Sequence, residues 1–390
     1  MTTLTLRQKR DDRYRGGHLW VFRDDLQSQP DLPAASLVRV VSAEGFSYGS
    51  GFYHPTSKIA VRLLGADVES VTTEFFADRF SHALAVRQAL LPGQHAFRLI
   101  HGESDLLSGL VVDIYDSVAV IQMLAAGMDA HQQNIVDALR LVFPSLQAIV
   151  EKNTARVREL EGLELRDGIL YGTVPTPLDI DEYGVTIRLD LLGGQKTGYF
   201  LDQKTNRTIV ASLAKGKRVL DCFCNVGGFA LHAAKAGATA VVGVDSSASA
   251  IAAAQQNAQL NRLGNVSFEV ANAFDFLRET AQQGARWDII ILDPPSFAKK
   301  RSSIDRAVAG YAELNRLALK ALQPGGILVS ASCTQLVPES MLLDILYREA
   351  ARLKRRLRLL YRGTQAADHP VLLGMPETQY LKCLVFDVLD

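Results

Sequence analysis

The sequence predicts an α/β protein whose last part is a doubly wound, Rossmann-like domain. Short strands separated by glycines fill the first 75 residues, and a mixture of strands and helices follows to about residue 180. From Lys217 onward, continuous apolar strands alternate regularly with helices, a pattern typical of a parallel sheet with helices on both faces. We therefore expect a small β-barrel domain at residues 1–75, a central α+β domain at 76–180 and the Rossmann-like domain at 181–390.

The N-terminal prediction depends on three apolar stretches, Leu37–Val41, Gly45–Tyr53 and Lys58–Leu64. Strands this short and this closely spaced are typical of a small barrel or sandwich. They indicate little about function by themselves.

The central domain begins with a helix predicted from about Glu74 to Leu90, which Pro92 and Gly93 end. The stretches Gly109–Tyr115 and Val118–Leu124 predict a hairpin that turns at Asp116 and Ser117. A helix near residues 129–141 and a strand at 148–152 complete an α+β pattern.

Composition limits the function classes. The formal net charge is zero, which argues against indiscriminate binding to polyanions but allows local basic clusters. Three such clusters occur, and a solvated helix face is the expected role of each. The clusters are Arg7, Lys9, Arg10, Arg13 and Arg15; Lys299, Lys300 and Arg301; and Arg352, Lys354, Arg355, Arg356 and Arg358.

No apolar run approaches membrane-spanning length and no signal peptide is visible, so we expect a cytoplasmic protein. The four cysteines are not expected to bind a metal.

The stretch from Val219 to Ala234 predicts a strand, a turn on Gly227 and Gly228, and a helix. At such a junction the backbone approaches a ligand closely, and the helix N-terminus offers amides to negative charge. Ligands of doubly wound sheets bind beyond the carboxyl ends of the strands. Five polar residues are expected at those ends: Asp221, Asp245, Asn272, Asp293 and Cys333.

The first turn distinguishes between cofactors. An acidic residue such as Asp245 hydrogen-bonds a ribose in both nicotinamide and S-adenosylmethionine (SAM) folds. The turn lacks the Gly-x-Gly-x-x-Gly pattern that accommodates a pyrophosphate, and Asp221 would repel one. Because a carboxylate suits the cationic amino group of a methionine moiety, SAM is favoured over a dinucleotide.

Asp293-Pro-Pro-Ser-Phe297 follows the fourth strand. Pro294 and Pro295 stiffen this loop, and Phe297 offers a face on which a flat base can stack. The alternative interpretation is an ordinary tight turn between strand and helix.

Cys333 follows the fifth strand, and its position suggests a reaction. Carbon 5 of a pyrimidine is too weak a nucleophile to take a methyl group directly. A thiolate that adds to carbon 6 turns the ring into an enolate-like nucleophile, and loss of the carbon-5 proton then releases the enzyme. The alternative is a small buried apolar cysteine. Packing or backbone contact is expected for Cys222, Cys224 and Cys383.

Several motifs together resemble the bacterial 23S ribosomal RNA cytosine-5 methyltransferases of the RlmI type. The motifs are Arg15–Phe22, Glu103–Asp113, Thr197–Arg207, Asp293–Phe297, Ser332–Thr334 and Ala366–Pro370. The resemblance implies an RNA-binding PUA domain, SAM as methyl donor and Cys333 as nucleophile. It is compatible with a homodimer, which the residues themselves do not indicate.

The same resemblance implies the individual site residues. The residues expected at the cofactor are Phe200, Asp202, Gln203, Arg207, Asp221, Phe223, Gly227, Asp245, Ser246, Asn272, Ala273 and Asp293. Among these, Asp245 is expected on the ribose and Asn272 near the adenine. Asp293 is also expected to act in catalysis with Cys333, and Pro294, Pro295 and Phe297 to contact the substrate base. Asn272 stands where relatives commonly have Asp, and Cys224-Asn-Val departs from their Ser- or Thr-rich turn.

Three other functions remain open at the level of sequence. A relative that methylates a guanine nitrogen needs no thiol, so Cys333 separates it from the cytosine-5 interpretation. A non-catalytic RNA-binding protein would not bind SAM, and a nicotinamide-dependent oxidoreductase would bind NAD.

Overall fold

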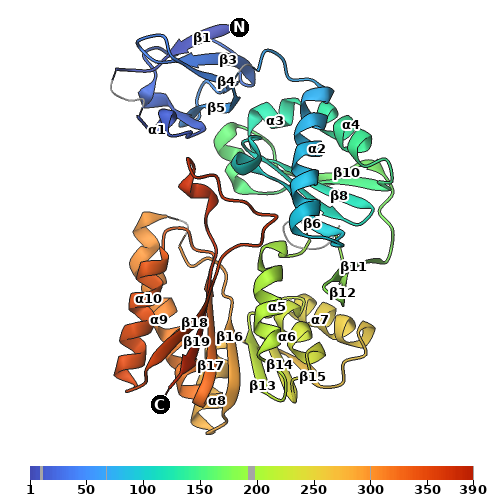
Figure 1. The fold of residues 1–390 in the computed structure, drawn as a ribbon, viewed down its shortest axis with the longest axis vertical. Coiled ribbons are helices and arrows are strands. Elements are labelled where there is room, and N and C mark those ends of the chain that lie inside the picture. The colour runs from blue at the N-terminus through green and yellow to red at the C-terminus, as the bar shows by residue number, and fades with distance from the viewer. Residues whose placement is uncertain (9–11, 67, 192–197, 299, 390) are drawn as a thin grey trace. The chain divides into compact units, whose positions relative to one another are not determined.

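The computed structural model describes residues 1–8, 12–66, 68–191, 198–298 and 300–389 (Figure 1). Thr197, the first residue of one motif, and Lys9, Arg10 and Lys299 of the basic clusters lie outside the described residues. The chain divides into two compact units. The N-terminal unit contains Met1–Ile180, Leu189–Leu201 and Ala367–Thr378, and the C-terminal unit contains Asp181–Arg188, Asp202–Ala366 and Gln379–Asp390. The finer division at residues 75 and 180 stays a prediction.

The first sheet of the N-terminal unit has five strands in the order β1-β3-β4-β5-β2. The strands are β1 (Thr2–Thr5), β2 (Trp20–Phe22), β3 (Ser36–Val41), β4 (Ser47–Tyr53) and β5 (Ile59–Gly65), and the short helix α1 (Asp12–Arg15) precedes β2. Alternating residues such as Val38 and Val40 are fully buried, as expected of strands that cover a core on one face. The three expected strands are confirmed, and β1 and β2 are additions.

The second sheet of this unit also has five strands, in the order β10-β9-β8-β7-β6. Its strands are β6 (Ala96–His101), β7 (Leu110–Tyr115), β8 (Val118–Met123), β9 (Ala148–Asn153) and β10 (Arg166–Gly172), with helices α2 (Thr73–Leu90), α3 (Ala126–Ala130) and α4 (Gln132–Val142). The side chain of Thr72 caps α2 by accepting the Phe75 N–H. The hairpin of β7 and β8 turns at Asp116, whose φ of 54° is left-handed. The expected α+β pattern is therefore confirmed.

A segment from late in the chain, Ala367–Thr378, belongs to the N-terminal unit. Asp368 Oδ2 accepts the backbone N–H of Arg98 at 3.1 Å, and the buried Arg87 donates to the Asp368 carbonyl at 3.3 Å. Met375 is fully buried in the core of the first sheet. The motif Ala366–Pro370, which the resemblance attributes to the catalytic domain, is thus divided between the two units.

Strands β11 (Leu178–Glu182) and β12 (Val185–Leu189) form a separate two-stranded sheet. The alternating apolar residues from Val185 to Leu191 predict a strand over residues 183–191, and the observed β12 is shorter at both ends. Tyr183 and Gly184 have φ values of 50° and 85°, so they form the turn that joins the two strands.

The C-terminal unit is built on a seven-stranded sheet in the order β15-β14-β13-β16-β17-β19-β18. Its strands are β13 (Arg218–Cys222), β14 (Ala240–Asp245), β15 (Val266–Val270), β16 (Trp287–Leu292), β17 (Leu322–Ser332), β18 (Leu357–Gly363) and β19 (Lys382–Val388). Strands β13 to β17 are parallel to one another, whereas β19 is antiparallel to β17 and β18. The Rossmann-like fold and its parallel strands are confirmed, and β18 and β19 extend the sheet in antiparallel pairing.

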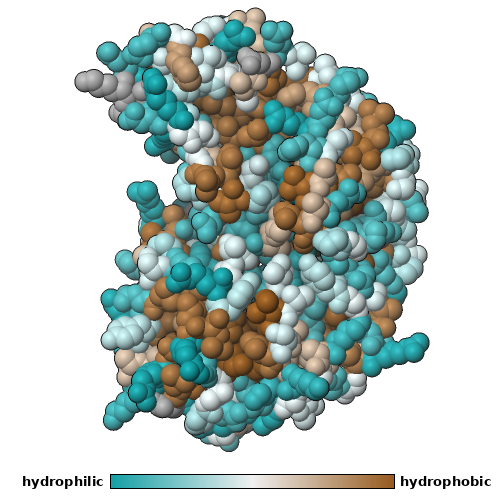
Figure 2. Space-filling view, viewed as in Figure 1, coloured by the Kyte–Doolittle hydropathy of each residue, from teal (hydrophilic) through white to brown (hydrophobic). Residues whose placement is uncertain are grey.

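Helices cover both faces of this sheet, with α5, α6 and α7 on one side and α9 and α10 on the other (Figure 1). They are α5 (Lys204–Ser212), α6 (Gly228–Lys235), α7 (Ala248–Leu260), α8 (Ala273–Gln282), α9 (Ile304–Ala321) and α10 (Glu339–Arg352). The core contains fully buried Leu220, Ile290 and Leu328 from three adjacent strands. On the face seen in Figure 2, hydrophobic residues also reach the surface where this sheet lies, among hydrophilic ones. No described helix is both long and apolar enough to cross a membrane.

Candidate active site

The polar residues predicted at strand ends do lie at the carboxyl ends of parallel strands. Asp221 is the penultimate residue of β13 and Asp245 the last of β14, while Asn272 follows β15. Asp293 directly follows β16, and Cys333 directly follows β17. Because β13 to β17 are parallel, these residues share one edge of the sheet.

The turn after β13 has a backbone that few residues adopt. Phe223, Asn225 and Gly227 have φ values of 64°, 50° and 90°. A Cβ on Gly227 would come within 2.9 Å of the Phe268 ring, so this position requires glycine for both its conformation and its space. Strand β13 ends at Cys222, so Cys224 lies in the turn.

Asp221 is a buried carboxyl group, only 1% exposed. Its Oδ2 accepts the N–H of Ala230 in the first turn of α6 at 3.0 Å, and its Oδ1 is buried without a hydrogen-bond partner. Burial raises the pKa of Asp221 to about 8, and the nearby charges of Asp293 and Asp245 act in the same direction. The Ala230 N–H and the charge of Arg207 oppose the shift. The group is therefore ready to ionise fully when a cation comes beside it.

Asp245 accepts two backbone amides. Its Oδ2 accepts the Asn225 N–H of the turn at 3.0 Å, and its Oδ1 accepts the Ser247 N–H at 2.9 Å. Asp245 therefore connects the turn after β13 with the start of α7, and Ser246, which follows it, is exposed. The expected contact with a ribose stays a prediction.

Asn272 caps helix α8. Its Oδ1 accepts the N–H groups of Phe274 and Asp275 at 2.9 and 3.4 Å, and Ala273 begins the helix as a buried residue. The Asn272 side chain is exposed. The Asn272 Oδ1 atom, which was expected near an adenine, thus already accepts hydrogen bonds from the backbone of α8.

Four of the residues expected at the cofactor lie just before α5 or within it, and their contacts differ from one residue to the next. Asp202 Oδ2 accepts the Tyr380 hydroxyl at 2.6 Å. Gln203 is buried; its Oε1 accepts the Asn206 amide at 2.6 Å, and its Nε2 has no hydrogen-bond partner. Arg207 forms a buried ion pair with Glu182 at 2.8 Å and lies over the Phe229 ring. Phe200 belongs to the N-terminal unit, and its role stays a prediction.

The loop after β16 is half-buried. Pro294 is buried and Pro295 exposed, so the two prolines do not present the same surface. Phe297 is partly buried, because its ring packs against Tyr311 with centroids 4.7 Å apart. Phe223, Phe274 and Phe297 form a row of ring contacts with spacings of 6.4 Å. This row connects the turn after β13 with Tyr311.

The turn that carries Cys333 is held by buried hydroxyl groups. The Tyr311 hydroxyl of α9 lies 2.8 Å from both Ser332 Oγ and Thr334 Oγ1, the neighbours of Cys333 in sequence. Thr334 Oγ1 also accepts the Phe297 N–H at 3.2 Å. Tyr311 thus connects the Cys333 turn with the loop that begins at Asp293.

The four cysteines differ in exposure. Cys222, Cys224 and Cys383 are buried, and burial raises the pKa of each thiol. Cys333 is partly exposed. Exposure and position together make Cys333 the cysteine suited to contact a substrate. No group of three or more potential metal ligands occurs among the described residues.

Sequence reasoning missed Tyr311 and Lys382. Lys382 is buried in β19, and its Nζ donates to the Thr334 and Tyr380 carbonyls at 2.8 and 3.0 Å. Lys382 is the one basic residue in the largely apolar stretch Tyr380–Val388, and this was a usable signal for it. Tyr311 had no comparable signal, since an aromatic residue on the buried face of a helix is ordinary core.

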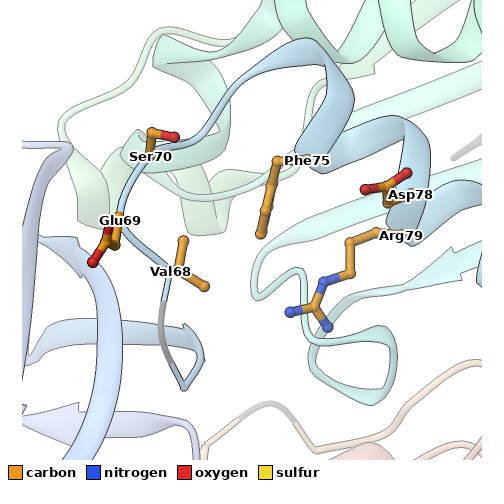
Figure 3. Close-up of a pocket in the computed structure, with 6 residues that line it drawn as sticks. All are labelled: Val68, Glu69, Ser70, Phe75, Asp78 and Arg79. Atoms are coloured by element: carbon orange, nitrogen blue, oxygen red, sulfur yellow. The ribbon is translucent and has the colours of Figure 1, made fainter.

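A surface hollow in the N-terminal unit lies apart from these residues in the sequence. It is lined by Val68, Glu69, Ser70, Phe75, Asp78 and Arg79 (Figure 3). Arg79 stacks over Phe75 and donates to the Leu64 carbonyl at 3.0 Å. The Arg79 guanidinium group thus stabilises the fold of this unit.

The strand-end residues of the C-terminal unit define a class of protein: a Rossmann-like domain that binds a nucleoside cofactor at the edge of its sheet. Residues 166–382 match the family model of S-adenosylmethionine-dependent methyltransferases, and residues 4–65 match the model of a PUA-like domain. Ribosomal RNA large subunit methyltransferase I of Tolumonas auensis and that of Shewanella denitrificans are each 38% identical to the chain, over 98% of both partners.

Solved structures agree in fold. A SAM-dependent methyltransferase from Streptococcus mutans aligns with a TM-score of 0.84 and 23% identity, over 99% of this chain and 100% of that one. The methyltransferase SMU.776, solved with SAH, aligns with a TM-score of 0.86 and 24% identity over the same shares. The chain belongs to the S-adenosylmethionine-dependent methyltransferase family, among the ribosomal RNA large subunit methyltransferases I. The family resemblance, the PUA-like domain and the SAM cofactor predicted from sequence are confirmed.

The residues present fit SAM. The amino acid end of SAM carries an ammonium and a carboxylate group. Asp221 Oδ1 is a buried acceptor and Gln203 Nε2 a buried donor, and each lacks a partner within the protein. Buried polar atoms of this kind are costly unless a ligand satisfies them.

Proposed function

We propose that the protein methylates carbon 5 of a cytosine in 23S ribosomal RNA through a covalent bond between Cys333 and the base. The observation that carries this proposal is the place of Cys333, partly exposed at the sheet edge that also bears Asp221 and Asp293. Relatives named ribosomal RNA large subunit methyltransferase I support the RNA substrate. A cytoplasmic location follows from that substrate.

In this proposal Asp221 and Gln203 hold the amino acid end of SAM, and Asp245 and Asn272 lie at its nucleoside. Phe223, Gly227, Ser246 and Ala273 form the walls between them. When bound, SAM supplies an electrophilic sulfonium methyl group. The protein contributes charge complementarity at Asp221 and a backbone turn that only glycine at 227 permits.

The Cys333 thiolate adds to carbon 6 of the cytosine, so that a carbon–sulfur bond forms and carbon 5 gains electron density. Carbon 5 would then take the methyl group that SAM supplies, with the sulfonium carbon–sulfur bond breaking to leave a neutral thioether. Loss of the carbon-5 proton to a base returns the electron pair to the ring, and the carbon–sulfur bond breaks to release the thiolate. In this proposal Asp293 and the loop Pro294–Phe297 contact the cytosine.

The PUA-like domain is proposed to hold the RNA, with the target base taken out of its stack to reach Cys333. A homodimer is compatible with this function and is not required by it.

Trapping tests the covalent step directly. RNA that contains 5-fluorocytidine should form a denaturation-resistant adduct with the wild-type protein when SAM is present, because fluorine cannot leave as a proton does. Cys333→Ala should form no adduct and lose methyl transfer by at least about a thousandfold, yet bind SAM with unchanged affinity.

Two results would contradict the proposal. Full methylation by Cys333→Ala would favour transfer to a guanine nitrogen. Absence of SAM binding by the wild-type protein would favour a non-catalytic RNA-binding role. Bisulfite sequencing of ribosomal RNA from cells with and without this gene would identify the cytosine.

A further inference from the structure

Lys382 lies close to the Cys333 turn in an unusual setting for a lysine. It is only 8% exposed, on a strand between two others of the sheet. In the antiparallel pairing of β17 and β19 it stands opposite Ser332, and its Nζ donates to the Thr334 carbonyl at 2.8 Å. Lys382 is therefore fixed to the residues on both sides of Cys333.

Two carbonyl oxygens are the hydrogen-bond partners of the Lys382 ammonium, and neither carries a charge. Within the described part of the chain, no carboxylate lies at ion-pair distance from it. A buried cation without a counter-charge is unfavourable. Accordingly, burial lowers the pKa of Lys382 to about 8.

Two anionic groups oppose that shift, Cys333 first and Glu339 second. Glu339 begins α10 and is already paired with Arg362 of β18 at 2.9 Å. Cys333, as a thiolate, is thus the anion best placed to complement the Lys382 charge. Tyr311 of α9 also interacts electrostatically with Cys333 and with Asp293, which follows β16, and Asp293 acts in turn on Cys383 of β19.

We propose that Lys382 is a positioning residue whose ammonium group holds Cys333 in its thiolate form and fixes the turn that presents it. This inference rests on the proposed function, in which Cys333 is the nucleophile. A cysteine with ordinary acidity is only a few per cent thiolate at pH 7. A neighbouring ammonium raises that fraction, and with it the share of molecules ready to attack carbon 6.

Alkylation of Cys333 by iodoacetamide tests this role without RNA or SAM. The full chain is treated across pH 6 to 10, and mass spectrometry of the Cys333 peptide gives the rate at each pH. The wild-type rate should be half-maximal below pH 8. Lys382→Met should move this midpoint up by about one pH unit and slow alkylation at pH 7 about tenfold.

Two further variants separate charge from packing. Lys382→Arg keeps a cation and should restore most of the wild-type profile. Lys320→Met removes an exposed lysine at the end of α9 and should leave the profile unchanged. Melting temperatures of all three show which variants are folded.

An unchanged midpoint in folded Lys382→Met would overturn the proposal. So would a wild-type midpoint at or above about 8.5, the ordinary value for a cysteine, and that result requires no variant. The 5-fluorocytidine adduct separates the two hypotheses. If no adduct forms but the pH midpoint of Cys333 alkylation is low, only the cytosine mechanism is rejected. If the adduct forms but the midpoint has the ordinary value for a cysteine, only the role of Lys382 is rejected.

Discussion

The two halves of the strand-end edge are built differently. At β13, β14 and β15, side-chain oxygens of Asp221, Asp245 and Asn272 accept backbone amides of the turns and helices that follow. At β16, β17 and β19, side chains bond to one another or to carbonyls, with the Tyr311 hydroxyl at the centre. The first half is held by bonds to backbone amides, and the second mainly by side-chain hydroxyl groups and a buried lysine.

This difference matches the tasks that the two halves have in the proposed function. A cofactor site needs a fixed backbone shape, which capping carboxylates provide. A nucleophile needs a defined position and charge, which a network of hydroxyl groups and one buried cation can supply. We therefore expect changes in the first half to alter SAM affinity, and changes in the second to alter the rate of transfer.

Among changes in the first half of the edge, the largest effect on SAM affinity is expected for Asp221→Asn. The asparagine oxygen can still accept the Ala230 N–H, but the negative charge proposed for the SAM ammonium is lost. SAM affinity should fall about 30-fold or more, equivalent to about 2 kcal/mol, by isothermal titration. An unchanged Kd would show that Asp221 serves the turn alone.

Unfolding at different pH values provides a matched control. The pKa of Asp221 is about 8 in the folded protein and near its ordinary value of 3.8 in the unfolded chain. The folded state therefore binds the proton more tightly, so stability from this group is complete below about pH 4 and declines as pH rises toward 8. Between pH 5 and 8, wild-type stability should fall more steeply than that of Asp221→Asn.

A smaller effect is expected for Tyr311→Phe. Loss of the hydroxyl leaves Ser332 and Thr334 without their shared partner, which should cost about 1–2 kcal/mol of stability. The turn that carries Cys333 loosens, so kcat should fall about tenfold while the Kd for SAM is unchanged.

Tyr53→Phe is the matched control for this variant, because it removes a buried tyrosine hydroxyl that donates to the Pro30 carbonyl in the N-terminal unit. It should cost similar stability without lowering kcat at saturating RNA. If kcat falls no more in Tyr311→Phe than in Tyr53→Phe, the Tyr311 hydroxyl contributes to stability only and does not position Cys333.

The same comparison explains what the sequence could predict. The strand, glycine turn and helix around Asp221 depend on neighbours in sequence, and they are found as expected. The residues predicted at the ends of β14, β15 and β16, which are Asp245, Asn272 and Asp293, lie within two residues of those ends, because apolar strands and capping residues are local signals.

The second half could not be predicted in this way. Tyr311 contacts Ser332 and Thr334, which are 21 and 23 residues away in sequence, and Lys382 contacts Thr334 through the antiparallel pairing of β17 and β19. Strand β18 and helix α10 were missed as well. Phe297 was expected to offer an open face, but its ring packs on Tyr311, a contact that depends on how α9 lies on the sheet.

The smallest effect concerns Asn272, whose oxygen caps α8. Asn272→Ala removes the cap and should lower the free energy of unfolding by about 1 kcal/mol. Asn272→Asp keeps the acceptor and adds a negative charge at the helix N-terminus, so stability should be retained or rise slightly. Denaturant unfolding of both variants measures this, and titration with SAM distinguishes the two roles. If the Asn272 oxygen serves only the stability of the helix, both variants should bind SAM within about twofold of the wild type. A several-fold loss of SAM affinity in Asn272→Ala, with none in Asn272→Asp, would show that the oxygen shared by Asn and Asp also matters for the cofactor.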